Sequence, residues 1–459
     1  MKEKLPVHKN EEYIVDIIDN GIDGEGIAKI EGFTVFIDGA LKGEKCKILI
    51  LKVVKSHAFG KILEIINKSD KRIDPDCSTY KRCGGCSLRH IEYEETLNIK
   101  QNIVQNLFNK SSLNYVKVRK TLGMGVPYNY RNKAVYPIGI NKKKEPVVGI
   151  YAKRTHEIIQ MRDCLIHDNI TEQIAFALYK FIKENNISIY DENKRNGLFR
   201  HVIIKVGIRT HEIMCIFVIN GKEIPKQKQL INMLTQRFPE IKTIIKNINK
   251  KNTNVIMGIH DEVIYGDGYI YDILGEYTFK ISPHSFYQVN SVQAEALYNI
   301  ALEMANLKKD DILYDLYCGI GTIGIFASKY VKKVYGIEVV SQAIIDAKEN
   351  AKLNNINNIT FIEGKAEETF EKVIKKYGDY PDIVIIDPPR KGIDINIINT
   401  ILSVESKKII YVSCNPATMV RDMKLLEDKY DVKEVQPVDM FPFTSHVECV
   451  VAMTLRETL

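Results

Sequence analysis

The sequence predicts a multidomain protein that ends in an α/β domain with a parallel, doubly wound sheet. With 459 residues, 45% of them hydrophobic, the chain is too long for one ordinary domain and can form two or three cores. Short apolar runs separated by glycines fill residues 5–66, which is typical of a small antiparallel β-barrel. Residues 281–459 alternate strand and helix patterns in βα units, whereas residues 67–280 mix both and predict an α+β central domain.

The charge distribution indicates a surface that binds nucleic acid. The net charge of +7 is modest, but residues 67–154 carry 18 Lys and Arg against seven Asp and Glu. A local positive excess is expected where a protein follows phosphates, although an ordinary solvated surface explains it equally well. The chain has neither a stretch of about 20 apolar residues nor the apolar core of a signal peptide. We therefore expect a soluble, cytoplasmic protein without a membrane partner.

Two basic segments are candidates for the RNA contact. Six lysines and one acid, Glu44, lie between Lys42 and Lys61, which suggests an RNA-binding barrel, with a generic β-domain as the alternative. In the central domain, aromatic and basic side chains interleave. These are Tyr128, Tyr130, Arg131, Lys133 and Lys142 to Lys144.

The start of the C-terminal domain has the pattern of a nucleoside-cofactor site. The apolar strand Ile312–Leu316 leads into a glycine-rich turn, Gly319-x-Gly321-x-x-Gly324, and then an apolar helix. About twenty residues on, a second strand ends in Glu338, placed to accept hydrogen bonds from ribose hydroxyls. S-adenosylmethionine is favoured over a dinucleotide, because Asp315 precedes the turn and no second glycine-rich turn follows. The Asp387-Pro388-Pro389-Arg390 segment after strand Ile383–Ile386 stands where such methyltransferases hold the target base.

A cysteine and an acid follow at the ends of later strands. Strand Lys408–Ser413 stops at Cys414, and Pro416 turns the chain out of the sheet, so the thiol is expected at the cofactor edge. Glu448 begins the final strand among apolar residues, where partial desolvation would raise its pKa toward that of a useful base. His446 competes for the role of base, and Cys449 for that of the nucleophile.

Taken together, these motifs resemble the RNA (uracil-5-)-methyltransferases over essentially the whole chain. The resemblance implies an OB-like TRAM barrel at the N-terminus and a Rossmann-like class I methyltransferase domain at the C-terminus. It also implies that Cys414 is the nucleophile and Glu448 the proton acceptor. Four residues would line the pocket for S-adenosylmethionine and the target base: Gln288, Tyr317, Glu338 and Asp387. The motifs are Ser413-Cys414-Asn415-Pro416, Asp387-Pro388-Pro389-Arg390-Lys391-Gly392, Asp315 to Thr322, Phe286 to Asn290 and His446-Val447-Glu448.

The implied chemistry explains why both a thiol and a base are needed. Carbon 5 of uracil is a poor nucleophile until a thiolate adds to carbon 6 and converts the ring into an enolate. After methyl transfer, a base must remove the proton on carbon 5 so that the cysteine can leave. The target uracil must also be single-stranded or extruded from its stack.

The chain has nine cysteines, an odd number, and the expected compartment is the cytoplasm, so we do not expect a disulfide framework. Cys77, Cys83 and Cys86 have the spacing of ligands, and Cys164 is the natural fourth. The spacing fits zinc or an iron–sulfur cluster, and the resemblance favours a [4Fe-4S] cluster. Where many relatives have glutamine, this chain has Arg89, outside the ligands.

The expected substrate is a structured RNA, 23S ribosomal RNA by resemblance, with transfer RNA as the alternative. A methyltransferase acting on an exocyclic base nitrogen would share the Asp-Pro-Pro motif but would need no nucleophile. A non-catalytic, RNA-binding iron–sulfur protein is the alternative outside enzymes. The sequence indicates no obligate protein partner.

Overall fold

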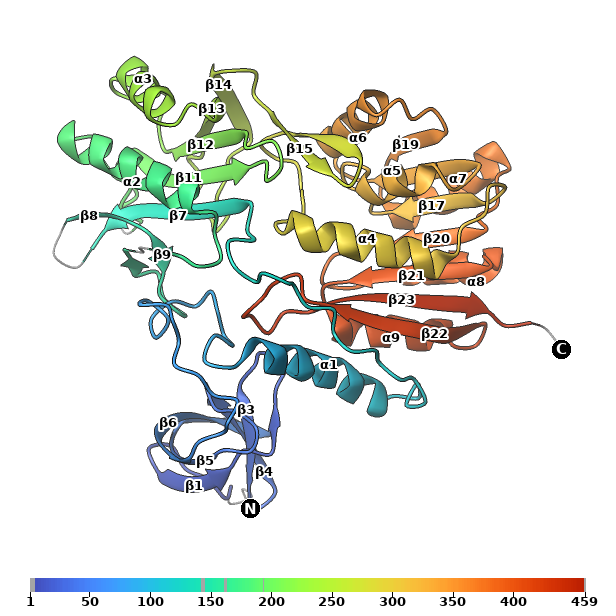
Figure 1. The fold of residues 1–459 in the computed structure, drawn as a ribbon, viewed down its shortest axis with the longest axis horizontal. Coiled ribbons are helices and arrows are strands. Elements are labelled where there is room, and N and C mark those ends of the chain that lie inside the picture. The colour runs from blue at the N-terminus through green and yellow to red at the C-terminus, as the bar shows by residue number, and fades with distance from the viewer. Residues whose placement is uncertain (1–4, 142–144, 161–162, 193, 458–459) are drawn as a thin grey trace.

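Two six-stranded sheets and one seven-stranded sheet organise the protein, whose computed structural model describes residues 5–457 except 142–144, 161–162 and 193. Figure 1 shows the N-terminal sheet apart from the other two, with the helix α1 (Tyr93–Asn109) leading from it toward the C-terminal sheet. This arrangement confirms the predicted succession of a small β-domain, a mixed region and an α/β domain.

The N-terminal sheet curls around its own core, because strands β1 and β3, which are distant in the hydrogen-bonded order β1-β5-β6-β4-β3-β2, contact each other. Cys46 and Ile48 of β5 point into this core, while the alternating Lys45 and Lys47 are partly exposed. One detail of the prediction is wrong: β4 pairs with β6 in parallel, since β5 lies between them in the chain. The strands are β1 (Glu12–Asp16), β2 (Asp19–Asn20), β3 (Gly26–Ile30), β4 (Phe33–Asp38), β5 (Lys45–Val53) and β6 (His57–Asn67).

The central sheet has the order β14-β13-β12-β11-β7-β8 and is antiparallel except for the pair β12–β13. Helices α2 (Asn169–Glu184) and α3 (Gln227–Arg237) contact its strands, and the Asp168 side chain caps α2 by accepting from Ile170 N. The strands are β7 (Lys133–Ile140), β8 (Pro146–Val148), β11 (Phe199–Val206), β12 (Ile213–Ile219), β13 (Ile241–Ile248) and β14 (His260–Tyr265). Two short pairs accompany it: β9 (Ile150–Tyr151) with β10 (Ile158–Ile159), and β15 (Ile270–Leu274) with β16 (Tyr277–Ile281).

The C-terminal sheet has the order β19-β18-β17-β20-β21-β23-β22, and β23 alone runs antiparallel to its neighbours. The reversal of strand order beside β17 is the switch point at which open α/β sheets bind ligands. Strands and helices alternate as β17 (Ile312–Leu316), α5 (Thr322–Ser328), β18 (Lys333–Glu338), α6 (Ser341–Leu353), β19 (Ile359–Glu363), α7 (Ala366–Tyr377), β20 (Ile383–Ile386), α8 (Ile395–Val404), β21 (Lys408–Ser413), α9 (Pro416–Leu426), β22 (Tyr430–Val438) and β23 (Glu448–Leu455).

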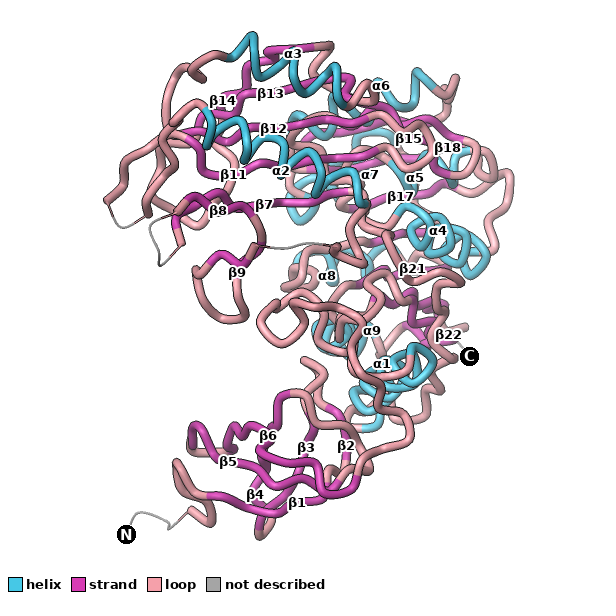
Figure 2. Tube along the Cα trace, turned by 60° about the vertical axis from the view of Figure 1, so that its left-hand side comes forward, coloured by secondary structure: helices cyan, strands magenta, loops and turns pink. Residues whose placement is uncertain are grey.

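Helices cover both faces of this sheet, so its strands are buried on each side (Figure 2). Leu313 packs with helix α4 (Ser291–Ala305) on one face, whereas Tyr314 packs with α7 on the other. Val104 and Phe108 of α1 belong to this second cluster, so α1 packs against the C-terminal sheet. None of the helices in the described part of the chain has the length and apolar composition to cross a bilayer.

We predict that Leu297→Ala destabilises the C-terminal domain by about 3 kcal/mol, because the fully buried Leu297 packs α4 onto the sheet and its loss leaves a cavity. Val292→Ala on the same helix is the matched control; Val292 is 53% exposed, so its cost should stay within about 0.5 kcal/mol. Urea titration followed by circular dichroism measures both. Equal losses in the two variants would contradict this account of how α4 is held.

Candidate active site and cysteine cavity

The turn between β17 and α5 is shaped for close approach of a ligand to the backbone. Gly319 and Gly321 adopt positive φ angles of 54° and 82°, and a Cβ on Gly321 would lie 2.5 Å from the Phe361 ring. The buried Asp315 carboxylate stabilises the turn by accepting from Gly324 N at 2.9 Å. Burial raises the pKa of Asp315 to about 8.

Glu338 ends β18 with its carboxylate aimed at the same turn. Oε2 accepts from Gly319 N at 3.2 Å, and Oε1 accepts from Val339 N at 2.8 Å and Val340 N at 2.9 Å. These backbone donors orient the carboxylate at the carboxyl edge of the sheet, the position expected for a group that holds ribose hydroxyls.

One cavity of about 720 Å³ brings together all six residues predicted for catalysis and cofactor binding. They are Gln288, Tyr317, Glu338, Asp387, Cys414 and Glu448. The cavity is large enough for a nucleoside cofactor together with a base. Its four acidic side chains, Glu338, Glu367, Asp387 and Glu448, suit the positively charged sulfonium of S-adenosylmethionine, so the residues present fit that cofactor.

This cavity is also lined by three side chains that had no predicted role: Phe286, Lys365 and Phe441. Phe286 is 68% exposed, which is unusual for a large aromatic side chain and suits it to stack on a ligand. Phe286 begins one of the motifs noted above, whereas Phe441 lies outside them. By sequence alone, an aromatic residue at either position cannot be distinguished from a core residue. No sequence pattern marks Lys365 as a site residue, because a charged residue is common just before a helix such as α7.

Strand register brings Cys414 and Glu448 together. In the antiparallel pair β21–β23, Ser413 lies opposite Cys449, so continuing the register by one residue sets Cys414 opposite Glu448. Directly opposite residues in such a pair are about 5 Å apart at Cα and point to the same face. Cys449 is buried in the apolar cluster on the other face and does not line the cavity. His446 is exposed and lines the cavity.

The electrostatics of the cavity favour protonated groups. Burial raises the pKa of Glu448 to about 8, with a further contribution from Asp387, and burial raises that of Asp387 to about 7. For Cys414, burial and the two neighbouring carboxylates raise the thiol pKa to about 11. Arg390 opposes the shifts of Glu448 and Cys414. The cavity thus holds carboxylates that are stronger bases than usual beside a thiol that needs help to ionise.

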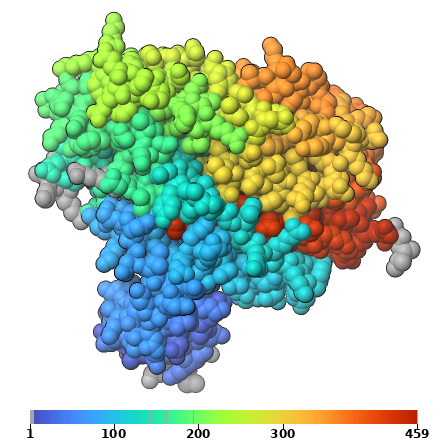
Figure 3. All heavy atoms as spheres, viewed as in Figure 1, coloured from blue at the N-terminus to red at the C-terminus, as the bar shows by residue number. Residues whose placement is uncertain are grey.

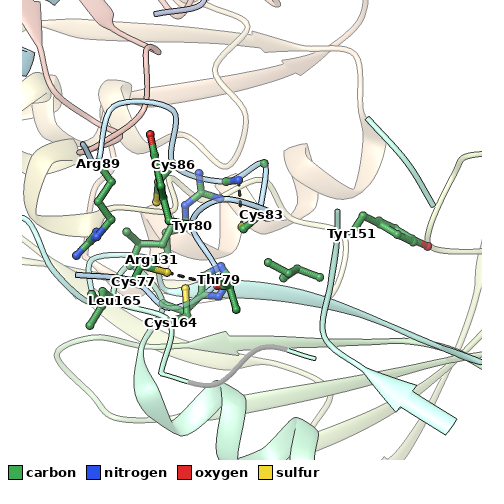
Figure 4. Close-up of a pocket in the computed structure, with 15 residues that line it drawn as sticks. Cys77, Thr79, Tyr80, Cys83, Cys86, Arg89, Arg131, Tyr151, Cys164 and Leu165 are labelled. Atoms are coloured by element: carbon green, nitrogen blue, oxygen red, sulfur yellow. Dashed lines mark hydrogen bonds between the residues drawn. The ribbon is translucent and has the colours of Figure 1, made fainter. Parts of the chain in front are cut away.

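The four predicted metal ligands, Cys77, Cys83, Cys86 and Cys164, line a second cavity of about 240 Å³ (Figure 4). Cys164 reaches it from the segment that precedes α2, far along the chain from the other three. Gly85 N donates to Cys83 Sγ at 3.2 Å, a contact that would stabilise a thiolate. Within the described ranges, no three or more Cys, His, Asp or Glu side chains are arranged to hold a single metal ion.

Only some of the residues predicted as the RNA surface of the central domain are exposed. Tyr128 and Lys133 are exposed, but Tyr130 is buried, because its hydroxyl donates to Pro442 O at 3.1 Å in the interior. Arg131 lines the cysteine cavity. Lys142 to Lys144 lie outside the residues that the structure describes.

Comparison with known proteins agrees with this geometry. The family profile described as tRNA (Uracil-5-)-methyltransferase matches residues 93–456, and that of the TRAM domain matches residues 6–63. An uncharacterized RNA methyltransferase of Oceanobacillus iheyensis is 44% identical over 458 residues, covering 99% of each chain. One of Clostridium acetobutylicum is 46% identical over 455 residues, covering 98% of each chain.

Among solved structures, the Pyrococcus abyssi tRNA (uracil-54, C5)-methyltransferase in complex with S-adenosyl-L-homocysteine has the same fold. It superposes with a TM-score of 0.77 at 24% identity, covering 96% of this chain and 100% of that one. The chain therefore belongs to the tRNA (uracil-5-)-methyltransferase family of S-adenosylmethionine-dependent RNA methyltransferases and carries a TRAM domain.

Proposed function

We propose that the protein methylates carbon 5 of a uridine in RNA through a covalent adduct between Cys414 and carbon 6. The observation that carries this proposal is the register that sets Cys414 opposite Glu448 in the cavity shared with Gln288, Tyr317, Glu338 and Asp387. A nitrogen methyltransferase would need no such pair of thiol and base.

Cys414 acts first. Its thiol proton leaves to solvent, helped by the positive charge of Arg390, and the thiolate bonds to carbon 6 of the uracil. The electron pair moves onto the ring, so carbon 5 becomes nucleophilic. S-adenosylmethionine supplies the methyl group, and carbon 5 then carries both the new methyl group and its original proton.

Glu448 completes the reaction. Its carboxylate takes the proton from carbon 5, the carbon 5 to carbon 6 double bond re-forms, and the Cys414 thiolate leaves and regains a proton from solvent. A carboxylate with a pKa raised to about 8 is a better proton acceptor than an ordinary one. Glu448 later releases its proton to solvent, so one proton is produced for each methyl group transferred.

The RNA substrate we propose is 23S ribosomal RNA, on the resemblance of the barrel and cysteine motif to large-subunit members of the family. Transfer RNA is the second candidate, because the matching family profile and the Pyrococcus abyssi enzyme are both named for tRNA. In either case the half-buried position of Cys414 in the cavity requires the target base to leave its stack.

We also propose that Cys77, Cys83, Cys86 and Cys164 hold a [4Fe-4S] cluster, with zinc as the alternative. In support, the four thiols surround one cavity instead of converging on a point, and Gly85 N donates to one of them. We infer a structural role for the cluster, or a role in positioning RNA, because these cysteines are separate from the cavity that contains Cys414.

We predict that Cys414→Ser lowers methyl transfer by at least about 10³-fold, because a hydroxyl cannot replace the thiolate as nucleophile. RNA containing 5-fluorouridine should trap a covalent complex with the unaltered protein and none with the variant. Cys449→Ser is the matched control and should keep the adduct. Separate 23S and transfer RNA transcripts identify the substrate class. Methylation without an adduct on either RNA would favour the exocyclic-nitrogen alternative.

We predict that Glu448→Gln still forms the adduct on ordinary uridine RNA but releases product about 10² to 10⁴ times more slowly, because no base removes the carbon 5 proton. The covalent complex should accumulate on denaturing gels. Since Glu448 must be ionised, and Cys414 also reacts as its anion, turnover of the unaltered protein should rise with pH up to about 8 and beyond. A rate that falls over this range would contradict these roles.

We predict that Cys86→Ser loses bound iron and acid-labile sulfide, because the cavity then lacks one thiolate ligand. Iron, sulfide and zinc analysis with visible absorption spectra of anaerobically purified protein provides the measurement. Cys215→Ser, a buried cysteine in the core of the central sheet, should retain the metal. Protein that contains zinc without sulfide would overturn the cluster in favour of zinc.

A further inference from the structure

The segment 439–446 joins β22 to β23 and brings Phe441 and His446 to the active-site cavity just before Glu448. It contains no helix or strand, and Phe443 has a positive φ of 63°, which is unusual for an aromatic residue. No ladder of backbone hydrogen bonds therefore keeps its shape. A local turn, in which Thr444 N donates to Phe441 O at 3.1 Å, and contacts from other parts of the chain do so.

A fully buried ion pair is the central contact. Lys100 Nζ, from the middle of α1, donates to Asp439 Oδ1, and both side chains have no exposed surface. The same ammonium donates to Phe441 O at 3.1 Å. One side chain thus holds two points of the segment, one of them the backbone of a residue that lines the active-site cavity.

Asp439 is held on its other sides as well. Its Oδ2 accepts from the Tyr93 hydroxyl at 2.8 Å, and its carbonyl accepts from Gln293 Nε2 at 3.1 Å. Its own amide donates to Leu122 O at 2.9 Å. Asp439 therefore forms hydrogen bonds with α1, with α4 and with the segment near Leu122.

The opposite side of the segment meets the chain beside the cysteine cavity. Leu88 N donates to Phe443 O at 2.9 Å, Ser445 N donates to Ser87 Oγ at 3.0 Å, and the Arg89 guanidinium stacks over the Phe443 ring at 4.3 Å. In Figure 3, red patches from the C-terminal part of the chain emerge among blue and cyan atoms of its first third. Segment 439–446 is thus contacted by α1 on one side and by residues 87–89 on the other.

We infer that Lys100 and Asp439 are positioning residues, which hold segment 439–446 so that Phe441 and Glu448 face Cys414 in the reactive arrangement. This inference rests on the proposed function, since it concerns the step that Glu448 performs. Neither side chain lines the active-site cavity, so the pair acts only through the segment that it holds. A shift of about 1 Å in a reacting group is enough to slow a reaction by about 10²-fold.

The physics of buried charges allows positioning to be separated from stability. Removing one partner of a buried pair leaves an uncompensated charge and destabilises the fold, whereas replacing both with neutral side chains of similar shape is often tolerated. Lys100→Met and Asp439→Asn should each lower the melting temperature. The double variant should recover most of that loss while the segment remains without its charged anchor.

The test compares these three variants with Asp311→Asn. Asp311 is a buried carboxylate just before β17, where it accepts from Lys308 N at 2.7 Å. It lies at the amino ends of the parallel strands, away from the active-site end, so this control disturbs the domain without touching the segment. For each protein, kcat, the KM for S-adenosylmethionine and the covalent complex on ordinary uridine RNA are measured. We expect the double variant to melt near the unaltered protein, to keep KM within about twofold, to lose about 10²-fold in kcat and to accumulate the complex.

If the pair serves stability alone, kcat of the double variant recovers together with its melting temperature, and the inference is overturned. A loss seen only as a higher KM overturns it too. Glu448→Gln separates this failure from that of the proposed function: if it accumulates the covalent complex while the double variant does not, only the positioning role is wrong. If neither protein nor the 5-fluorouridine RNA gives a complex, the proposed chemistry fails first.

Discussion

The antiparallel insertion of β23 between β21 and β22 is the constraint on which the active site depends. In a wholly parallel sheet, the carboxyl ends of strands present their residues from separate loops, each with its own freedom. Here the amino end of β23 meets the carboxyl end of β21, so the register of the pair, continued by one residue, sets Glu448 opposite Cys414. Strand pairing thus fixes the relative position of Cys414 and Glu448 more closely than two independent loops would.

Burial gives this arrangement its chemistry. Burial raises the pKa of both Asp387 and Glu448, and Asp387 raises that of Glu448 further. For the Cys414 thiol, burial and both carboxylates raise the pKa. Arg390 is the opposing charge. A positive charge near these groups lowers the pKa of each of them.

The N-terminal half of the chain completes the C-terminal domain. Helix α1 fills one face of the sheet with Val104 and Phe108 and holds segment 439–446 through Lys100. The segment beside the cysteines touches the same region from the other side through Leu88 and Ser87. The cysteine cavity and the active site are therefore neighbours in one packed structure, although their residues are far apart in sequence.

The local sequence is enough to predict which side chains stand at strand ends. The glycine turn after Ile312–Leu316, Glu338, Asp387 and Cys414 all follow apolar runs, and parallel strands bring such ends to one edge. Long-range contacts place Tyr130 in the interior, Phe441 at the active-site cavity and Cys164 with three distant cysteines. They also set Glu448 opposite Cys414. Local patterns report periodicity and burial, whereas the pairing of distant strands and the course of an irregular segment depend on contacts between residues hundreds of positions apart.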